Sequence, residues 1–390
     1  MIVPEQFTLA GREPGRIVEP DSAAELAAAL GACAQRGEAV VPFGGGTLQG
    51  IGNGPARYDV ALLTRRLDAV REYDHRDLTI GVDAGITVET FSRTLAAYGQ
   101  FVPLDVPQPE QATIGGVLAS GWVGPRRATY GRARDLLIGA TAALADGTLA
   151  SSGGMVVKNV TGYDVGKLYV GSLGTLGVIV RANFKALPKP PARRFATAPL
   201  PDDARDRAVA ALATLTIEPV AALAIDGFGG PQRLVVLFEG SEASVERATR
   251  DLRSALGRTG VAETALLDGD AAERAFARVV AAYTEVIGER TITYREPGLP
   301  SSAWERAQRV RDLGGEIIAD MRTGDVIARF SRQHVRSVMP RAAIIAGAAR
   351  LRSDLDAWGE PPTTMPTMRA LKRRFDPAGI LAPGRFIGGI

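Results

Sequence analysis

Glycine is concentrated in three short segments that lie far apart in the chain, and this pattern restricts the possible folds more than any other feature of the sequence. The first segment is VVPFGGGTLQGIGNG at residues 40–54, the second is TIGGVLASG at residues 113–121, and the third is GSLGTLGVI at residues 171–179. Glycine lets another backbone or a ligand approach closely, because it has no side chain. Three separate glycine clusters are better explained as the walls of one crevice than as three independent turns.

The first segment begins with an apolar run that is expected to form a strand over residues 40–43. A glycine loop after a strand can adopt positive φ angles and direct consecutive backbone N–H groups at one point, which makes an anion site without a charged side chain. A diphosphate fits such a site, and an ordinary tight turn is the alternative interpretation. A helix that starts at residues 113–116 would direct further free N–H groups toward an anion.

Two common nucleotide-binding patterns are excluded by the spacing of the glycines. The chain contains no G-x-x-x-x-G-K-[ST] sequence, so it is not a P-loop nucleotide hydrolase. No glycine cluster fits G-x-G-x-x-G followed by a helix and an acidic residue for the ribose, which argues against a Rossmann NAD site.

Length and composition predict a soluble protein with two domains. The 390 residues are 46% hydrophobic and 23% charged, and no apolar stretch is long enough to span a bilayer. The N-terminus lacks the residue order of a secretory signal, so we expect a cytosolic (cytoplasmic) protein that reaches a membrane at most through a partner. The net charge of +3, without a basic patch interleaved with aromatic residues, argues against nucleic acid as a partner. The single cysteine, Cys33, excludes internal disulfides and is expected to be buried in a helix.

Local patterns predict several elements in the first half of the chain. Ser22 begins a capping box before an alanine-rich helix, and Thr87 is expected to cap another helix. Alternation over residues 78–84 predicts a strand, and Asp146-Gly147 predicts a hairpin turn. The stretch LPKPPARR at residues 187–194 cannot continue a helix or a central strand, so we expect a linker between domains there.

Glycine clusters become rarer after this stretch, and the order of the expected elements changes. An antiparallel sheet backed by helices is expected, which is an α+β layer. The helices are expected over residues 203–215, 244–256, 301–313 and 342–351, and the strands over residues 220–225, 233–238 and 261–267.

The glycine segments and their neighbours resemble the FAD-binding domain of the vanillyl-alcohol oxidase and p-cresol methylhydroxylase (PCMH) family. The matching motifs are VPFGGGT at residues 41–47, VDAGITV at 82–88, ATIGGVLASG at 112–121, YGRARDLLIG at 130–139, LADG at 144–147 and GSLGTLGVIV at 171–180. The closing FDPAGILAPGRF resembles the tail by which such proteins return to the flavin domain.

This resemblance implies an α+β fold in three parts. Residues 1–191 would form a PCMH-type FAD-binding domain of two α+β subdomains. Residues 192–352 would form a smaller α+β cap domain with an antiparallel sheet, and residues 353–390 a C-terminal segment that returns to the FAD domain.

The resemblance also implies where FAD would bind. Residues 42–47 would hold the pyrophosphate through backbone N–H groups, the second segment would line the phosphate and ribityl region, and the third would approach the adenine or the dimethyl edge of the flavin. The residues so assigned are Pro42, Phe43, Gly44, Gly45, Gly46, Thr47, Thr113, Ile114, Gly115, Gly116, Ser120, Gly121, Tyr130, Gly131, Gly171, Gly174, Gly177, Val178 and Ile179. Some relatives attach flavin through a His or Cys in the first loop or near the second segment; neither residue type occurs there, which predicts non-covalent FAD.

Oxidation of a 2-hydroxy acid needs a group near the flavin that takes the hydroxyl proton. Dehydrogenases of this type usually place histidines of the second domain over the flavin, often with a metal. This chain has two histidines: His75 lies in a turn where it is expected to be solvated, and His334 is a candidate base with a surface position at a helix start as the alternative. A paired-histidine metal site cannot be assembled from them, so no metal is predicted.

The stretch GGMVVKNVTGYDVGKLYVGS contains two further weak catalytic candidates, Lys158 and Lys167. In one interpretation Asp164 and Lys167 form a local ion pair and Tyr163 packs. In the other, Lys158 or Lys167 lies near flavin N1 and stabilises the reduced ring.

The segments KNVTGYD and GSLGTLGVI, together with a short second domain that has few histidines, most resemble the GlcE-type FAD-binding subunits of bacterial glycolate oxidase complexes. Relatives that work alone carry Glu at the position of Leu173. The resemblance implies two partners, a larger FAD-binding catalytic subunit and an iron–sulfur subunit, with this chain contributing a second FAD. A self-sufficient FAD-dependent D-2-hydroxy-acid dehydrogenase and a structural subunit whose FAD never cycles remain alternatives.

Overall fold

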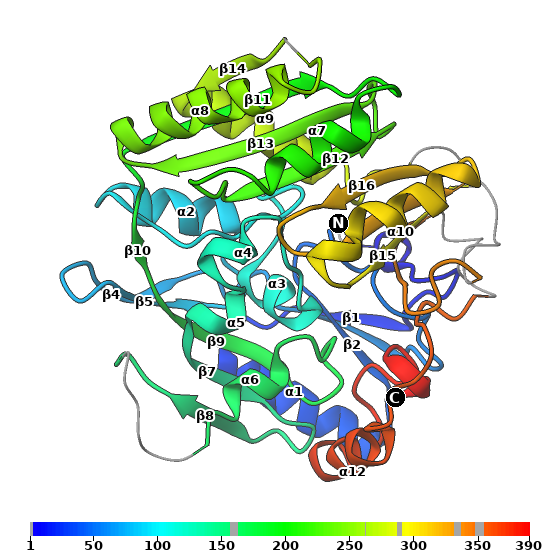
Figure 1. The fold of residues 1–390 in the computed structure, drawn as a ribbon. Coiled ribbons are helices and arrows are strands. Elements are labelled where there is room, and N and C mark those ends of the chain that lie inside the picture. Colours follow the sequence, from blue (N-terminus) through cyan, green and yellow to red (C-terminus); the bar gives the residue numbers. More distant parts are fainter. Residues whose placement is uncertain (1–2, 157–162, 262, 287–290, 331–336, 348–354) are drawn as a thin grey trace. The chain divides into compact units, whose positions relative to one another are not determined.

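The computed structural model describes residues 3–156, 163–261, 263–286, 291–330, 337–347 and 355–390 (Figure 1). The chain divides into two compact units. Unit 1 comprises Met1–Val123, Arg132–Pro188 and Ala348–Ile390, and unit 2 comprises Gly124–Gly131 and Lys189–Gly347. Within the described ranges, no helix has the length and apolar character needed to cross a membrane.

Unit 1 contains a small parallel sheet whose strand order is β1-β3-β2, formed by β1 (Arg16–Val18), β3 (Val60–Leu63) and β2 (Val40–Phe43). The helix α1 (Ala23–Arg36) packs Leu26 and Leu30 into a buried cluster with residues of these strands. The glycine loop begins where β2 ends, so the sheet fixes the starting point of the loop.

Unit 1 also contains a five-stranded antiparallel sheet with the order β4-β5-β9-β7-β8. Its strands are β4 (Val70–Asp74), β5 (Thr79–Asp83), β9 (Val178–Lys185), β7 (Leu137–Ala143) and β8 (Leu149–Gly153). The buried cluster around α1 includes Ala143 and Val178 of this sheet and also Ile380 and Leu381 near the end of the chain. One core therefore joins both sheets to the C-terminal segment.

Several predicted local signals are confirmed in unit 1. The Ser22 hydroxyl accepts a hydrogen bond from the Glu25 N–H at the start of α1, and the Thr87 hydroxyl accepts one from the Thr90 N–H at the start of α2 (Val88–Ala96). Gly147 has φ +86° in the hairpin between β7 and β8. Cys33 is 2% exposed, and this burial raises the pKa of its thiol.

The boundary between the two units falls inside the predicted linker at residues 187–194, between Pro188 and Lys189, but both ends of this stretch form strands instead of linker. Leu187–Pro188 form β10, which pairs with β6 (Gln100–Phe101), and β11 already begins at Ala192. The prolines end at Pro191, and every residue from Ala192 to Ala198 has the N–H group that a strand needs. A strand can therefore begin at Ala192, directly after the last proline, although the proline-rich composition of residues 187–194 suggested a linker.

Unit 2 is built on an eight-stranded antiparallel sheet with the order β14-β11-β13-β12-β16-β17-β15-β18 (Figure 1). The strands are β11 (Ala192–Pro199), β12 (Ala221–Asp226), β13 (Arg233–Gly240), β14 (Ala265–Asp268), β15 (Ile292–Glu296), β16 (Glu316–Asp320), β17 (Val326–Phe330) and β18 (Ala343–Gly347). The helices are α7 (Arg205–Leu212), α8 (Glu242–Gly257), α9 (Gly269–Ala281) and α10 (Pro300–Asp312). This arrangement confirms the predicted α+β class with an antiparallel sheet in the second half of the chain.

The helix expected over residues 342–351 is wrong at residues 343–347, where β18 forms instead, and residues 348–351 lie outside the described residues. Ile344 pairs with Tyr294 of β15, and Ile344 and Ile345 are buried. Two adjacent β-branched residues fit a strand, and pairing with β15 overrides the helix propensity of the surrounding alanines. Sequence patterns also missed α9 and the strands β15, β16 and β17.

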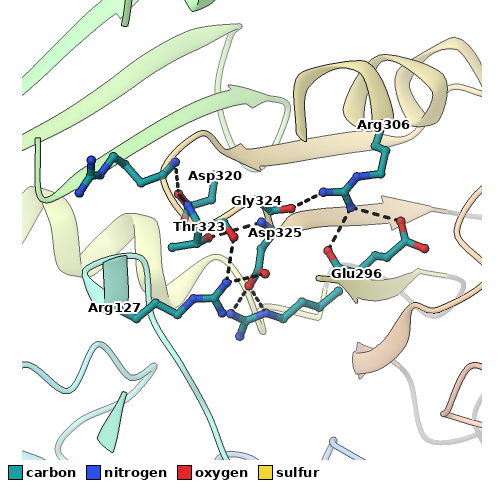
Figure 2. Close-up of polar contacts among 9 residues, drawn as sticks. Arg127, Glu296, Arg306, Asp320, Thr323, Gly324 and Asp325 are labelled. Carbon is teal, nitrogen blue, oxygen red and sulfur yellow. Dashed lines mark hydrogen bonds and ion pairs between the residues drawn. The ribbon is translucent and has the colours of Figure 1, made fainter. Parts of the chain in front are cut away.

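Residues 124–131, which contain α4 (Arg127–Tyr130), are held in unit 2 by buried carboxylates. Asp325, which is 2% exposed, accepts hydrogen bonds from Arg127 at 2.7 Å and from Arg295 Nε at 2.7 Å (Figure 2). Glu239 accepts a hydrogen bond from the Tyr130 hydroxyl at 2.7 Å and forms an ion pair with Arg126 at 3.1 Å.

The electrostatic balance differs between the buried carboxylates of unit 2. Burial opposes ionisation of Glu239, but the guanidinium groups of Arg126 and Arg193 outweigh it and hold the pKa of Glu239 below its usual range. Asp320 lies at the end of β16, and its Oδ1 accepts the N–H groups of Arg322 and Thr323, each at 3.0 Å. Burial raises the pKa of Asp320 to about 6.

We therefore expect Asp320 to make the stability of the protein depend on pH. Between about pH 4 and pH 6 the folded protein binds the Asp320 proton more tightly than the unfolded chain does, so the contribution of this group to stability falls as the pH rises. In Asp320→Asn, the amide Oδ1 can accept the same two N–H groups but cannot ionise. Relative to the wild type, this variant should gain roughly 3 kcal/mol in the free energy of unfolding as the pH rises through this window.

Urea unfolding of both proteins at several pH values checks this prediction. The difference between the two free energies of unfolding isolates Asp320, because other titrating groups are common to both proteins. Parallel pH profiles for the wild type and the variant would contradict it.

Candidate functional site

The three glycine segments line one cavity of about 70 Å³ in unit 1. The first segment contributes residues 42–49, the second contributes Thr113, Gly115, Gly116, Ala119 and Ser120, and the third contributes Leu173, Gly174, Gly177, Val178 and Ile179. Thr64 and Arg385 complete the lining. Most of the residues expected to bind FAD are thus brought together around one space.

A second cavity, of about 540 Å³, borders the same loop. It shares residues 43–46, Gln49 and Thr113 with the first cavity. Its further lining includes polar side chains, among them Arg65 and Thr87. The glycine loop therefore borders two cavities.

Some of the glycines are required because the segments contact one another. A Cβ atom on Gly44 would lie 2.0 Å from Thr113 Oγ1, and one on Gly45 would lie 1.7 Å from the Gln111 carbonyl oxygen. A Cβ on Gly121 would lie 2.9 Å from the Cα of Gly171. The sequence suggested that a ligand excluded these side chains, whereas the structure shows that neighbouring protein atoms already exclude them: the Thr113 side chain at Gly44 and main chain at Gly45 and Gly121.

The main chain of the first segment presents a row of hydrogen-bond donors. The N–H groups of Gly44, Gly45, Gly46, Thr47 and Leu48 donate to no acceptor within the described part of the chain. Gly45 and Gly46 are exposed, and of the three consecutive glycines Gly46 alone has a positive φ, +77°. We call these five groups the amide row; adjacent N–H groups that border a cavity can bind an anion.

The second segment does not supply free N–H groups, so that part of the sequence interpretation is wrong. The helix α3 (Ile114–Ser120) starts at these residues, but its first N–H groups already have acceptors. The Ile114 N–H donates to the Ile86 carbonyl at 3.0 Å, and the Gly115 N–H donates to the Ala84 carbonyl at 2.7 Å. The Gly116 N–H donates to Thr113 Oγ1 at 3.2 Å. The start of α3 is docked on residues 84–86 instead of facing an anion.

Five residues assigned to FAD from the sequence do not line either cavity. They are Ile114, Gly121, Tyr130, Gly131 and Gly171. Ile114 is fully buried, and the Gly171 N–H donates to the Leu118 carbonyl at 2.8 Å, which connects the second and third segments. Tyr130 and Gly131 belong to unit 2, where the Tyr130 hydroxyl donates to Glu239.

Sequence reasoning missed Arg385, Gln49 and Leu173 among the cavity residues. Arg385 is 2% exposed, and its guanidinium donates to the Gln49 side-chain oxygen and the Ile51 carbonyl, each at 2.7 Å. An arginine after Pro-Gly in an otherwise apolar tail was the available signal. Leu173 has φ +54°, which is uncommon for a residue other than glycine.

Lys167 and His75, the candidates that the structure describes, line neither cavity. His334 and Lys158 lie outside the described residues. Lys167 forms an ion pair with Asp164 at 2.8 Å, which confirms the local pair, but Tyr163 is 94% exposed and does not pack as expected. His75 is exposed, as expected, and stacks on Tyr98 with ring centroids 4.4 Å apart. No group of three His, Cys, Asp or Glu residues in the described ranges is placed to hold a metal ion.

Comparison with known protein families gives two matches. Residues 14–153 match the FAD binding domain, and residues 358–386 match the C-terminal domain of FAD linked oxidases. The second match contains Arg385, and the first contains the amide row.

Known proteins give further similarities. The chain is 28% identical over 321 residues to glycolate oxidase subunit GlcE of Escherichia coli (strain K12), which covers 80% of this chain and 83% of GlcE. It is 33% identical over 181 residues to glycolate oxidase subunit GlcD of Bacillus subtilis (strain 168), which covers 46% of this chain but only 38% of GlcD. The fold is similar to that of p-cresol methylhydroxylase with substrate bound, with a TM-score of 0.72 at 15% identity over 96% of this chain and 88% of that one.

The two family matches contain the first two glycine segments and Arg385 of the cavity lining, and the fold similarity extends over nearly the whole chain. The chain is therefore similar to FAD binding domains over residues 14–153 and to the C-terminal domain of FAD linked oxidases over residues 358–386, and its fold is similar to that of p-cresol methylhydroxylase.

Proposed function

We propose that unit 1 binds FAD non-covalently and that the chain is the FAD-binding subunit of a glycolate oxidase complex, taking part in the oxidation of glycolate to glyoxylate. The amide row is the observation that carries this proposal. A diphosphate needs several donors in a small space, and five consecutive main-chain N–H groups without acceptors in the described structure provide them.

The residues of the cavity fit a dinucleotide. The amide row would donate to the diphosphate oxygens, and hydrogen bonds to charged groups are worth about 1.5–3 kcal/mol each. The first cavity is much smaller than a dinucleotide, but the second adds about 540 Å³ beside the same loop. FAD, when bound, supplies the two-electron oxidation chemistry. Neither His nor Cys is among the described residues that line the cavities, which supports a dissociable cofactor.

Membership of a complex is supported by the similarity to GlcE and by the position of the candidate bases. The alignment covers most of both chains. Lys167 is engaged with Asp164, and His75 is on the surface. With these two candidates away from the cavities, a larger FAD-binding catalytic subunit would supply the proton acceptor, and an iron–sulfur subunit would receive the electrons. Such a complex would be cytoplasmic and would reach the inner membrane only through its partners.

Flavin reduction tests the proposed function. The purified chain should be yellow, and its FAD should stay oxidised when glycolate is added anaerobically; co-purified with its neighbouring gene products, it should turn over glycolate. Bleaching of the isolated chain by glycolate or D-lactate would instead indicate a self-sufficient dehydrogenase. Turnover of the complex while the FAD of this chain stays oxidised would indicate a structural cofactor. A folded chain that does not bind FAD would overturn the proposal.

The glycine loop gives a second prediction. In Gly45→Ala, the new Cβ would meet the Gln111 carbonyl oxygen, so the loop must move and the amide row loses its alignment. We expect the dissociation constant for FAD to rise by about 10- to 100-fold, which corresponds to the loss of one charge-assisted hydrogen bond. Flavin fluorescence titration measures this constant.

Gly257→Ala is the matched control. A Cβ on Gly257, at the end of α8 in unit 2, meets no atom within 4 Å. This variant should bind FAD as the wild type does. A folded Gly45→Ala protein with wild-type affinity would show that the amide row does not bind the cofactor.

A further inference from the structure

We infer that residues 372–386, here called the C-terminal clasp, hold the cofactor site in its binding conformation, and that Arg385 is the residue through which they act. This inference rests on the proposed binding of FAD in unit 1. It assigns to the end of the chain a role in positioning the amide row.

Arg385 connects both ends of the turn that follows the amide row. Its Nη1 donates to Gln49 Oε1 at 2.7 Å, and its Nη2 donates to the main-chain oxygens of Gln49 at 3.1 Å and Ile51 at 2.7 Å. Gln49 Nε2 in turn donates to the Pro42 carbonyl at 2.8 Å. The residue before the glycines and the residues after them are thus linked to one buried guanidinium.

The main chain around Arg385 adds further contacts with the same turn. The Asn53 N–H donates to the Arg385 carbonyl at 2.9 Å, and the Ala56 N–H donates to the Pro383 carbonyl at 2.7 Å. A Cβ on Gly52 would lie 2.7 Å from the Arg385 carbonyl oxygen, so the two segments are in direct contact.

The other end of the clasp contacts strand β2 and the third glycine segment. Lys372 Nζ donates to the Thr175 carbonyl at 2.9 Å and to the Leu381 carbonyl and Asp376 Oδ2, each at 2.7 Å. The Val40 N–H donates to the Ile380 carbonyl at 2.8 Å at the start of β2. The clasp therefore connects two of the three segments that line the cavity.

These contacts have a physical consequence for binding. A glycine-rich loop loses more conformational entropy on ordering than other loops do. If the clasp already orders the loop, FAD does not have to, and the affinity is higher. The positive charge of Arg385, which lines the cavity with 2% exposure, also favours a dianionic diphosphate there. Conversely, FAD should stabilise the docked clasp, because a ligand stabilises the form that binds it.

Two variants of Arg385 and one control test the inference in the full-length chain. Arg385→Met should raise the dissociation constant for FAD at least about tenfold, since it removes the charge and three hydrogen bonds. Arg385→Lys should recover part of the affinity, because it keeps the charge but not the two-pronged geometry. Arg309→Met, at an exposed position of α10 in unit 2, removes an arginine outside the clasp and should bind FAD as the wild type does.

Hydrogen–deuterium exchange of the wild type gives a measurement that does not depend on any variant folding. Addition of FAD to the flavin-free chain should slow amide exchange at residues 44–54 and at residues 379–386 together. Slower exchange in the loop alone, or wild-type affinity in a folded Arg385→Met protein, would overturn the inference while leaving the proposed function intact. A wild-type chain that does not bind FAD would instead overturn both.

Discussion

Five consecutive main-chain N–H groups, at residues 44–48, have no acceptor within the described structure, and these residues line the first cavity, where a ligand could accept from them. This arrangement persists because the surrounding main chain is packed too tightly to rearrange. Gly44 and Gly45 lie directly against residues 111–113, and Gly174 lies against Pro42. The glycines let the segments touch, and the loop that they form leaves a row of donors without acceptors beside a cavity.

Buried ion pairs occur in both units. In unit 1, Lys372 pairs with the buried Asp376 at 2.7 Å, while the charged side chains that line the cavities are Arg385 in the first and Arg65 and Asp68 in the second. In unit 2, Asp325 and Glu239 form buried ion pairs with residues 124–131. This segment lies in the sequence between two parts of unit 1 but belongs to unit 2. Figure 2 shows the contacts at the turn between β16 and β17, where Asp325 accepts a hydrogen bond from Arg295 and Arg306 donates to the Gly324 carbonyl. Removing one member of such a buried pair costs about 3–5 kcal/mol, because the remaining charge stays buried.

Local sequence signals were sufficient for elements that depend on neighbouring residues. The caps at Ser22 and Thr87 and the hairpin at Asp146-Gly147 form as predicted, because their partners are within a few positions. The glycine pattern itself indicated that the three segments line one crevice, and the resemblance to a known family supplied the cofactor. Strand β18 and the position of Arg385 at the cavity were not predicted, because both depend on distant partners. Strand β18 forms through pairing with β15, and Arg385 contacts Gln49, which is 336 positions away in the sequence. The engaged N–H groups at the start of α3 were missed for the same reason, since their acceptors are at Ala84 and Ile86.

The account depends on recognition of a diphosphate by main-chain N–H groups, and comparison of FAD with riboflavin tests this most directly. Riboflavin has the same ring system but no phosphate, so it cannot use the amide row. Calorimetric titration of the flavin-free chain should show FAD binding at least about 100-fold more tightly than riboflavin, which corresponds to two charge-assisted hydrogen bonds. Equal affinities for the two flavins would show that the amide row does not hold the diphosphate and would contradict the account.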